Sequence, residues 1–91
     1  MGFTVVEIQS TPNPNASKFV LDGSVSPQPM SFFNAAAAQG VPLAEALFAI
    51  DGVSSLLLLG DFITINKSPQ AKWADITPRA RAVLAAATSP I

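Results

Sequence analysis

The chain has 91 residues, of which 49% are hydrophobic and 12% are charged, and this balance predicts a single compact domain over residues 1–91 rather than a disordered chain. Five basic and six acidic residues leave a net charge of −1, which argues against a nucleic-acid partner because phosphate binding needs a surplus of positive charge. Cys and His are absent, so we expect no disulfide, no catalytic thiolate or imidazole, no metal site, no bound cofactor and no enzymatic activity.

The first part of the chain predicts a β-hairpin. Apolar and polar residues alternate over residues 3–8, as in a half-buried strand. Residues 11–15, here called the Pro-Asn loop, contain two prolines that remove backbone donors and extend the residues before them, so we expect a stiff connection. A second strand is expected over residues 17–21, and Asp22-Gly23 ends it.

The middle of the chain predicts a loop followed by a helix. Residues 24–40 contain Pro27 and Pro29 and few large apolar residues, which indicates mainly loop, with contact to the sheet at Phe32. A helix is expected to begin near Pro42, because proline is favoured in a first helical turn. Apolar residues follow at helical spacing, namely Leu43, Ala46, Leu47 and Ile50.

A second hairpin is predicted after this helix. Gly52 stands where a helix ends in a left-handed residue, and a strand is expected to follow over residues 53–59. Gly60-Asp61 is a Gly-first pair, typical of a type II′ turn, and it leads into a strand over residues 62–67. These two strands are therefore expected to pair antiparallel.

The C-terminal part predicts a helix with an apolar stripe. Thr77 caps and Pro78 begins a new turn, so we expect one helix that is broken at this point. Trp73 stands at the head of the stripe and is expected to be largely buried against the sheet. A role for Trp73 as an exposed stacking platform is the alternative.

The order strand, strand, helix, strand, strand, helix predicts an α+β fold of two layers, in which a four-stranded antiparallel sheet carries two helices on one face. The longest apolar runs, residues 35–38 and 56–59, are far shorter than the ~20 residues of a membrane span. The N-terminus lacks the basic region of a signal peptide. We therefore expect a soluble, cytoplasmic protein with no membrane partner.

The Pro-Asn loop and the six carboxylates are the candidates for chemistry. Acid–base catalysis needs carboxylates that converge, whereas these are scattered as surface charges and turn formers would be. Asn13 and Asn15 supply donors and acceptors on a constrained backbone. We expect an ordered loop in which Asn13 or Asn15 bonds to backbone groups of the adjoining hairpin or helix ends, either as a structural turn or as a binding edge.

Three segments of the sequence, taken together with their order and spacing, form a recognisable pattern. They are residues 11–19 (TPNPNASKF), residues 42–53 (PLAEALFAIDGV) and residues 61–65 (DFITI). Together they resemble the N-terminal domain of Nfu-type (NifU-like) iron–sulfur scaffold proteins, and the resemblance runs from about Glu7 to the last helix. In that family a second domain carries a C-x-x-C motif, which is missing from this sequence.

The resemblance implies an accessory domain that docks to an iron–sulfur scaffold, a recipient protein or an assembly protein without itself ligating the cluster. The residues expected to contact this partner are Thr11, Asn13, Asn15, Lys18, Asp61 and Phe62. The alternative is a small-molecule-binding domain or small enzyme that uses the Pro-Asn loop and nearby carboxylates. Convergent polar groups in a concave pocket would favour this alternative, and a flatter patch would favour docking.

Overall fold

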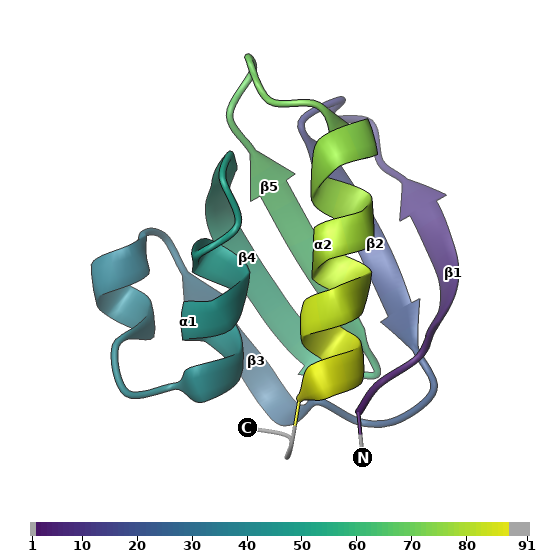
Figure 1. Cartoon of the computed structure of the whole chain (residues 1–91). Coiled ribbons are helices and arrows are strands. Elements are labelled where there is room, and N and C mark those ends of the chain that lie inside the picture. The colour runs from purple at the N-terminus through teal and green to yellow at the C-terminus, as the bar shows by residue number, and fades with distance from the viewer. Residues whose placement is uncertain (1, 88–91) are drawn as a thin grey trace.

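An antiparallel sheet of five strands carries the fold (Figure 1). The computed structural model describes residues 2–87, and the strands lie in the spatial order β1-β2-β5-β4-β3. Each strand is antiparallel to its neighbours, so β1 and β3 form the two edges of the sheet. The strand bounds are β1 (Val5–Ser10), β2 (Ala16–Leu21), β3 (Ser26–Phe32), β4 (Val53–Gly60) and β5 (Phe62–Lys67).

Both α-helices cover the same face of the sheet (Figure 1). They are α1 (Pro42–Phe48), which packs near β4, and α2 (Trp73–Ala86), which packs on β2 through its first residue. A 3₁₀ helix, η1 (Ala35–Ala38), precedes α1. The expected two-layer α+β architecture with the helices on one face is confirmed. None of the helices within residues 2–87 is long and apolar enough to span a membrane.

The core lies between the sheet and the helices, because side chains of a strand alternate between its two faces. Every second residue of β2 is buried, and Phe19 of this strand is fully enclosed. Ile63 and Ile65 of β5 are buried in the same way. The helix α2 contributes a stripe at every fourth position, namely Ile76, Ala80 and Leu84. Strand alternation and helical spacing therefore build one apolar cluster.

The expectation of four strands was wrong, because residues 24–40 are not mainly loop. Residues 26–32 form β3, which pairs with β4 and makes the element order strand, strand, strand, helix, strand, strand, helix. Pro27 and Pro29 are exposed in this strand, and proline is tolerated there because an edge strand has one side without ladder hydrogen bonds. The predicted contact at Phe32 is real, since Phe32 is buried and pairs with Leu56.

The expected break at Pro78 is also wrong, because α2 continues from Trp73 to Ala86 with Pro78 inside it. Proline removes the hydrogen bond that its N–H would donate to the carbonyl four residues earlier, which belongs to Ala74. Ala74 and Pro78 are both exposed, so water can satisfy that carbonyl. The buried stripe on the other side of α2 holds the helix together across this position.

The β4–β5 hairpin is confirmed. Leu59 lies opposite Phe62, so Gly60 and Asp61 form a two-residue connection. Gly60 has a φ of 58°, the positive value that the first position of a type II′ turn requires. This prediction succeeds because the turn conformation depends on the residues of the turn itself.

Replacing Gly52 by alanine is expected to destabilise the fold. Gly52 has a φ of +96°, and a Cβ atom at this position would lie 2.5 Å from the Cβ of Ala71. We expect Gly52→Ala to lower the free energy of unfolding by about 2–4 kcal/mol, through left-handed backbone strain and overpacking. Urea unfolding measures this loss.

The matched control is Gly40→Ala. Gly40 has a φ of +90°, but nothing lies within 4 Å of the position that an added Cβ would take, so only the backbone strain of about 1–2 kcal/mol applies. If both variants lose the same free energy of unfolding, the structure around Ala71 accommodates the added Cβ without an energetic penalty.

Candidate functional site

The Pro-Asn loop is closed by its own side chains. The hydroxyl of Thr11 donates to the carbonyl of Asn13 at 2.8 Å and accepts from the Asn13 N–H at 3.2 Å. The Oδ1 atom of Asn13 accepts from the backbone N–H of Asn15 at 2.9 Å. The loop is therefore ordered as expected, and Asn13 bonds to a backbone group within the loop itself.

Two distant residues anchor the loop to the rest of the domain. Lys67, the last residue of β5, donates its N–H to the carbonyl of Asn15 at 2.7 Å and its Nζ to Asn15 Oδ1 at 3.0 Å. Trp73 donates its Nε1–H to the carbonyl of Pro14 at 3.1 Å. The side chain of Asn15 thus accepts from a lysine rather than from the backbone group that we expected.

Trp73 packs on the core and reaches the loop at the same time. Its ring lies 6.2 Å from the ring of Phe19, measured between centroids, at an interplanar angle of 50°. The Nζ of Lys67 lies 5.9 Å from the centroid of the indole. The side chain is half-buried rather than largely buried, because one part faces the core and the other holds the Pro-Asn loop.

Lys18 and Phe62 meet on the face of the sheet that the helices leave uncovered. Both alternate along their strands with buried residues, and the Nζ of Lys18 lies 4.3 Å from the centroid of the Phe62 ring. Val20 and Leu59 lie opposite Phe62 on the two neighbouring strands. These four half-buried side chains, here called the open-face cluster, form a small apolar surface with one positive charge.

The six residues predicted as a docking site fall into three places along β2. Thr11, Asn13 and Asn15 share the Pro-Asn loop at its start, and Lys18 lies in the strand beside Phe62 of β5. The exposed Asp61 is at the far end, where its carbonyl accepts from the N–H of Leu21 at 2.7 Å. A six-residue strand is roughly 17–20 Å long, so Asp61 is remote from the loop.

The anchors Lys67 and Trp73 were not predicted as part of this site. They are 52 and 59 residues away from their partners in the loop, and no local pattern indicates such pairings. Lys67 ends a predicted strand and Trp73 begins a predicted helix, so only the assembled sheet brings them to the loop.

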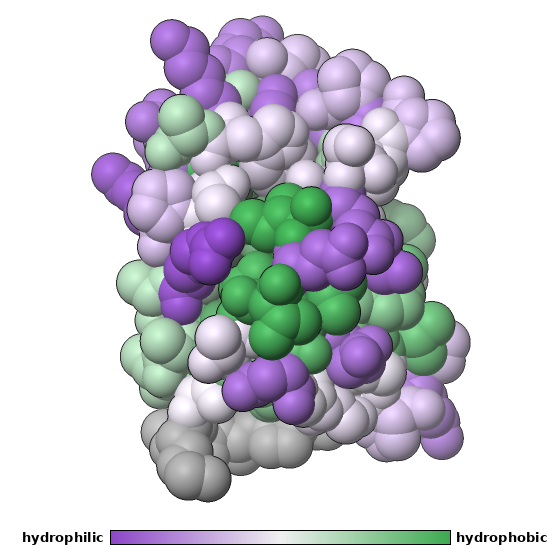
Figure 2. Space-filling model, turned by 90° about the vertical axis from the view of Figure 1, so that its right-hand side faces the viewer, coloured by the Kyte–Doolittle hydropathy of each residue, from purple (hydrophilic) through white to green (hydrophobic). Residues whose placement is uncertain are grey.

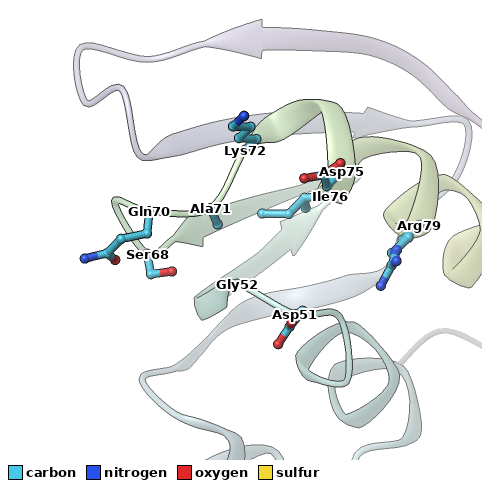
Figure 3. Close-up of a pocket in the computed structure, with 9 residues that line it drawn as sticks. All are labelled: Asp51, Gly52, Ser68, Gln70, Ala71, Lys72, Asp75, Ile76 and Arg79. Carbon is cyan, nitrogen blue, oxygen red and sulfur yellow. The ribbon is translucent and has the colours of Figure 1, made fainter.

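A separate open pocket of about 430 Å³ lies between the start of β4 and the start of α2 (Figure 3). Its charged lining residues are Asp51, Lys72, Asp75 and Arg79. No residue of the Pro-Asn loop lines it, so the loop and these carboxylates do not form the joint site that the small-molecule alternative requires. Within residues 2–87, no group of three or more acidic side chains is placed to hold a metal ion.

Comparison with known proteins confirms the family resemblance. The family model described as "Scaffold protein Nfu/NifU N terminal" matches residues 6–89. The chain is 40% identical to the mitochondrial NFU1 iron–sulfur cluster scaffold homolog of Drosophila willistoni and 37% identical to that of Drosophila sechellia, over 81 residues in each case. These matches cover 87% of this chain but only 28% and 29% of the relatives, so the chain spans less than a third of their length.

Solved structures share the fold. The solution structure of a NifU-like protein from Saccharomyces cerevisiae matches with a TM-score of 0.75 and 29% identity, over 87% of this chain and 73% of that chain. The crystal structure of protein SAV1430 from Staphylococcus aureus matches with a TM-score of 0.73 and 26% identity, over 91% of this chain and 98% of that chain.

Replacing Trp73 is expected to release the Pro-Asn loop. Trp73→Phe keeps most of the contact with Phe19 but loses the hydrogen bond to Pro14, at a cost of about 1 kcal/mol. Trp73→Ala also loses the packing, and because the ring is half-buried we expect about 2–3 kcal/mol rather than the ~3–5 of an enclosed aromatic.

Urea unfolding measures the loss of unfolding free energy in both variants. Hydrogen exchange of the Lys67 amide reports whether the loop stays in place, since this N–H donates to the carbonyl of Asn15. Exchange should be faster in both variants. Unchanged exchange in Trp73→Phe would show that the bond to Pro14 does not hold the loop.

Proposed function

The chain belongs to the family of Nfu/NifU scaffold N-terminal domains, and from this membership we propose that it is a non-enzymatic docking domain in iron–sulfur cluster assembly or delivery. The family is one of scaffold proteins, which points to a role without catalysis. The partner is an iron–sulfur scaffold, a recipient protein or an assembly protein. The cluster is the cargo, and the partner supplies the ligands, because this chain has no Cys and no His.

The anchored Pro-Asn loop is the observation that carries the proposal. Two hydrogen bonds from Lys67 and Trp73 hold the backbone of the loop, and a third holds the side chain of Asn15, while Asn13 at the tip of the loop is exposed. A binding edge that is already ordered loses little conformational entropy when a partner binds. Within residues 2–87, the NH2 groups of Asn13 and Asn15 donate no hydrogen bond, so both are available as donors to a partner.

The open-face cluster supports the same role from the adjacent surface. Phe62 and its apolar neighbours offer contact area, and Lys18 adds a positive charge that is held over the aromatic ring. Lys18 is in the strand that the Pro-Asn loop enters, so one partner can contact the loop and the cluster together. Asp61 precedes Phe62 on the side of the cluster that is farther from the loop, so it belongs to the contact only if the partner reaches beyond Phe62.

The compartment is part of the proposal. The cytoplasmic location expected from the sequence stays a prediction, and fractionation of the native host tests it. The two curated relatives are named as mitochondrial proteins. Each is more than three times as long as the part that matches this chain.

Docking predicts that loop and cluster variants bind a scaffold less tightly than the unmodified chain. The experiment titrates ¹⁵N-labelled chain with the purified C-x-x-C scaffold protein of the same host and follows amide shifts. We expect shifts at the non-proline residues of the range 11–18 and at Phe62. The double variant Asn13→Ala with Asn15→Ala, and separately Phe62→Ser, should each weaken binding about tenfold, as loss of one good contact does.

The matched control is Phe33→Ser, which removes an aromatic side chain that is 80% exposed at the other edge of the sheet. It should leave the affinity unchanged. Free energies of unfolding are measured on the same variants, and a loss of binding no larger than the loss of stability would assign the two asparagines to the fold alone. Shifts confined to Asp51, Ser68 and Arg79 would place the ligand in the separate pocket and contradict docking at the loop.

The chain alone is expected to hold no iron–sulfur cluster. Thiolates are the usual ligands of such clusters, and carboxylates are poor substitutes for them. Anaerobic reconstitution followed by desalting should leave no stoichiometric visible absorption band. A band that survives desalting would contradict the prediction and require ligation by oxygen atoms.

A further inference from the structure

The two edges of the sheet differ in how they are protected. β3 carries Pro27 and Pro29, which have no N–H to offer a further strand, and its pairing with β4 is interrupted between Ser26 and Met30. β1 contains no proline over its six residues and carries one charged residue, Glu7. Its pairing with β2 also has an irregularity, which lies between Val5 and Glu7. β1 therefore keeps all of its backbone N–H groups, whereas β3 lacks two of them.

The β1 edge exposes an apolar side chain, Val6, beside the polar residues Glu7 and Ser10. Val6 is 60% exposed there, and Ile8 is half-buried beside the core. Figure 2 views the molecule from the side that β1 forms and shows a group of hydrophobic side chains surrounded by hydrophilic ones. An edge strand that keeps all of its N–H groups is a template for strand pairing.

We propose that β1 pairs antiparallel with β1 of a second copy of this chain, about a two-fold axis at Ile8, so that one sheet runs through both copies. A two-fold axis makes each contact occur twice, and antiparallel strands fit such an axis without a change in the backbone. In this register Ile8 lies opposite Ile8 of the second copy. Glu7 lies opposite Gln9 of the second copy, and Gln9 lies opposite Glu7.

The charge of the strand favours this register and this occupant. An axis at Glu7 would place the two Glu7 carboxylates opposite each other, which is destabilising. An axis at Ile8 places each carboxylate opposite a neutral amide that can donate to it, and it places apolar side chains at the centre. The strand is therefore complementary to itself. This inference is independent of the proposed docking function, because it uses the backbone edge of β1 and not the Pro-Asn loop.

The test changes Gln9 to a positive and to a negative residue and measures self-association by sedimentation up to millimolar chain concentration. Gln9→Lys places a lysine opposite Glu7 twice per dimer and should lower the dissociation constant about fivefold. Gln9→Glu places a second carboxylate opposite Glu7 twice and should raise the dissociation constant about fivefold.

The same two variants separate pairing between copies from stability within one copy. Inside the chain, Gln9 lies opposite Lys18 on β2. Gln9→Lys therefore places like charges together in the monomer, and Gln9→Glu places opposite charges together. Gln9→Lys is therefore expected to destabilise the monomer and strengthen the dimer, and Gln9→Glu is expected to do the reverse. A change in the stability of the fold cannot by itself produce this result.

A second pair of variants tests the edge itself. Val6→Lys puts a charge on the β1 edge, as natural edge strands do to prevent pairing, and should abolish the dimer. Phe33→Lys changes the other large exposed hydrophobic residue, which lies beyond β3, and should leave the dimer unchanged. A chain that stays monomeric at every concentration, or a dimer that responds equally to both Gln9 variants, would overturn the proposal.

Discussion

The contact between Trp73 and the Pro-Asn loop joins the core to the surface, and the shape of the candidate site depends on it. Prolines reduce the conformations of the loop but do not select one of them. The selection comes from the indole, which rests on Phe19 and donates to Pro14, and from Lys67, which bonds twice to Asn15. These anchors exist only when β5 and α2 are in place. The loop is therefore ordered by the completed fold, and loss of core packing under Trp73 would also loosen the candidate site.

The features that sequence predicted correctly are those determined by neighbours in the chain. The Gly60-Asp61 turn and the helix that begins at Pro42 depend on a few adjacent residues, and both occur where expected. The third strand, β3, was missed because its prolines indicate a loop when read locally. Proline is acceptable at a sheet edge, and the edge position of β3 depends on how the other four strands are ordered. That order is a property of the whole chain.

The candidate site shows the same division between local and long-range information. Sequence resemblance named the residues, and loop residues that are adjacent in the chain, such as Asn13 and Asn15, were also adjacent in space. The contact of Lys18 with Phe62 required the register of β2 against β5, which places Val20 opposite Phe62. The sequence resemblance grouped Asp61 with Phe62. Asp61 lies in the turn between β4 and β5, at the end of β5 that is far from the Pro-Asn loop.

Placement of the helices decides which surfaces remain for binding. One face of the sheet is covered by α1 and α2 (Figure 1), and the β3 edge lacks two N–H groups because of its prolines. Apart from the separate pocket, the surfaces considered for binding are the Pro-Asn loop, the open-face cluster and the β1 edge, and β1 and β2 carry or adjoin all three. Pairing of β1 with a second copy would extend the open face across the axis. In the proposed register Thr11 lies opposite Val5 of the second copy, so each loop begins next to the interface. Such a dimer would offer a partner two ordered loops on one continuous sheet.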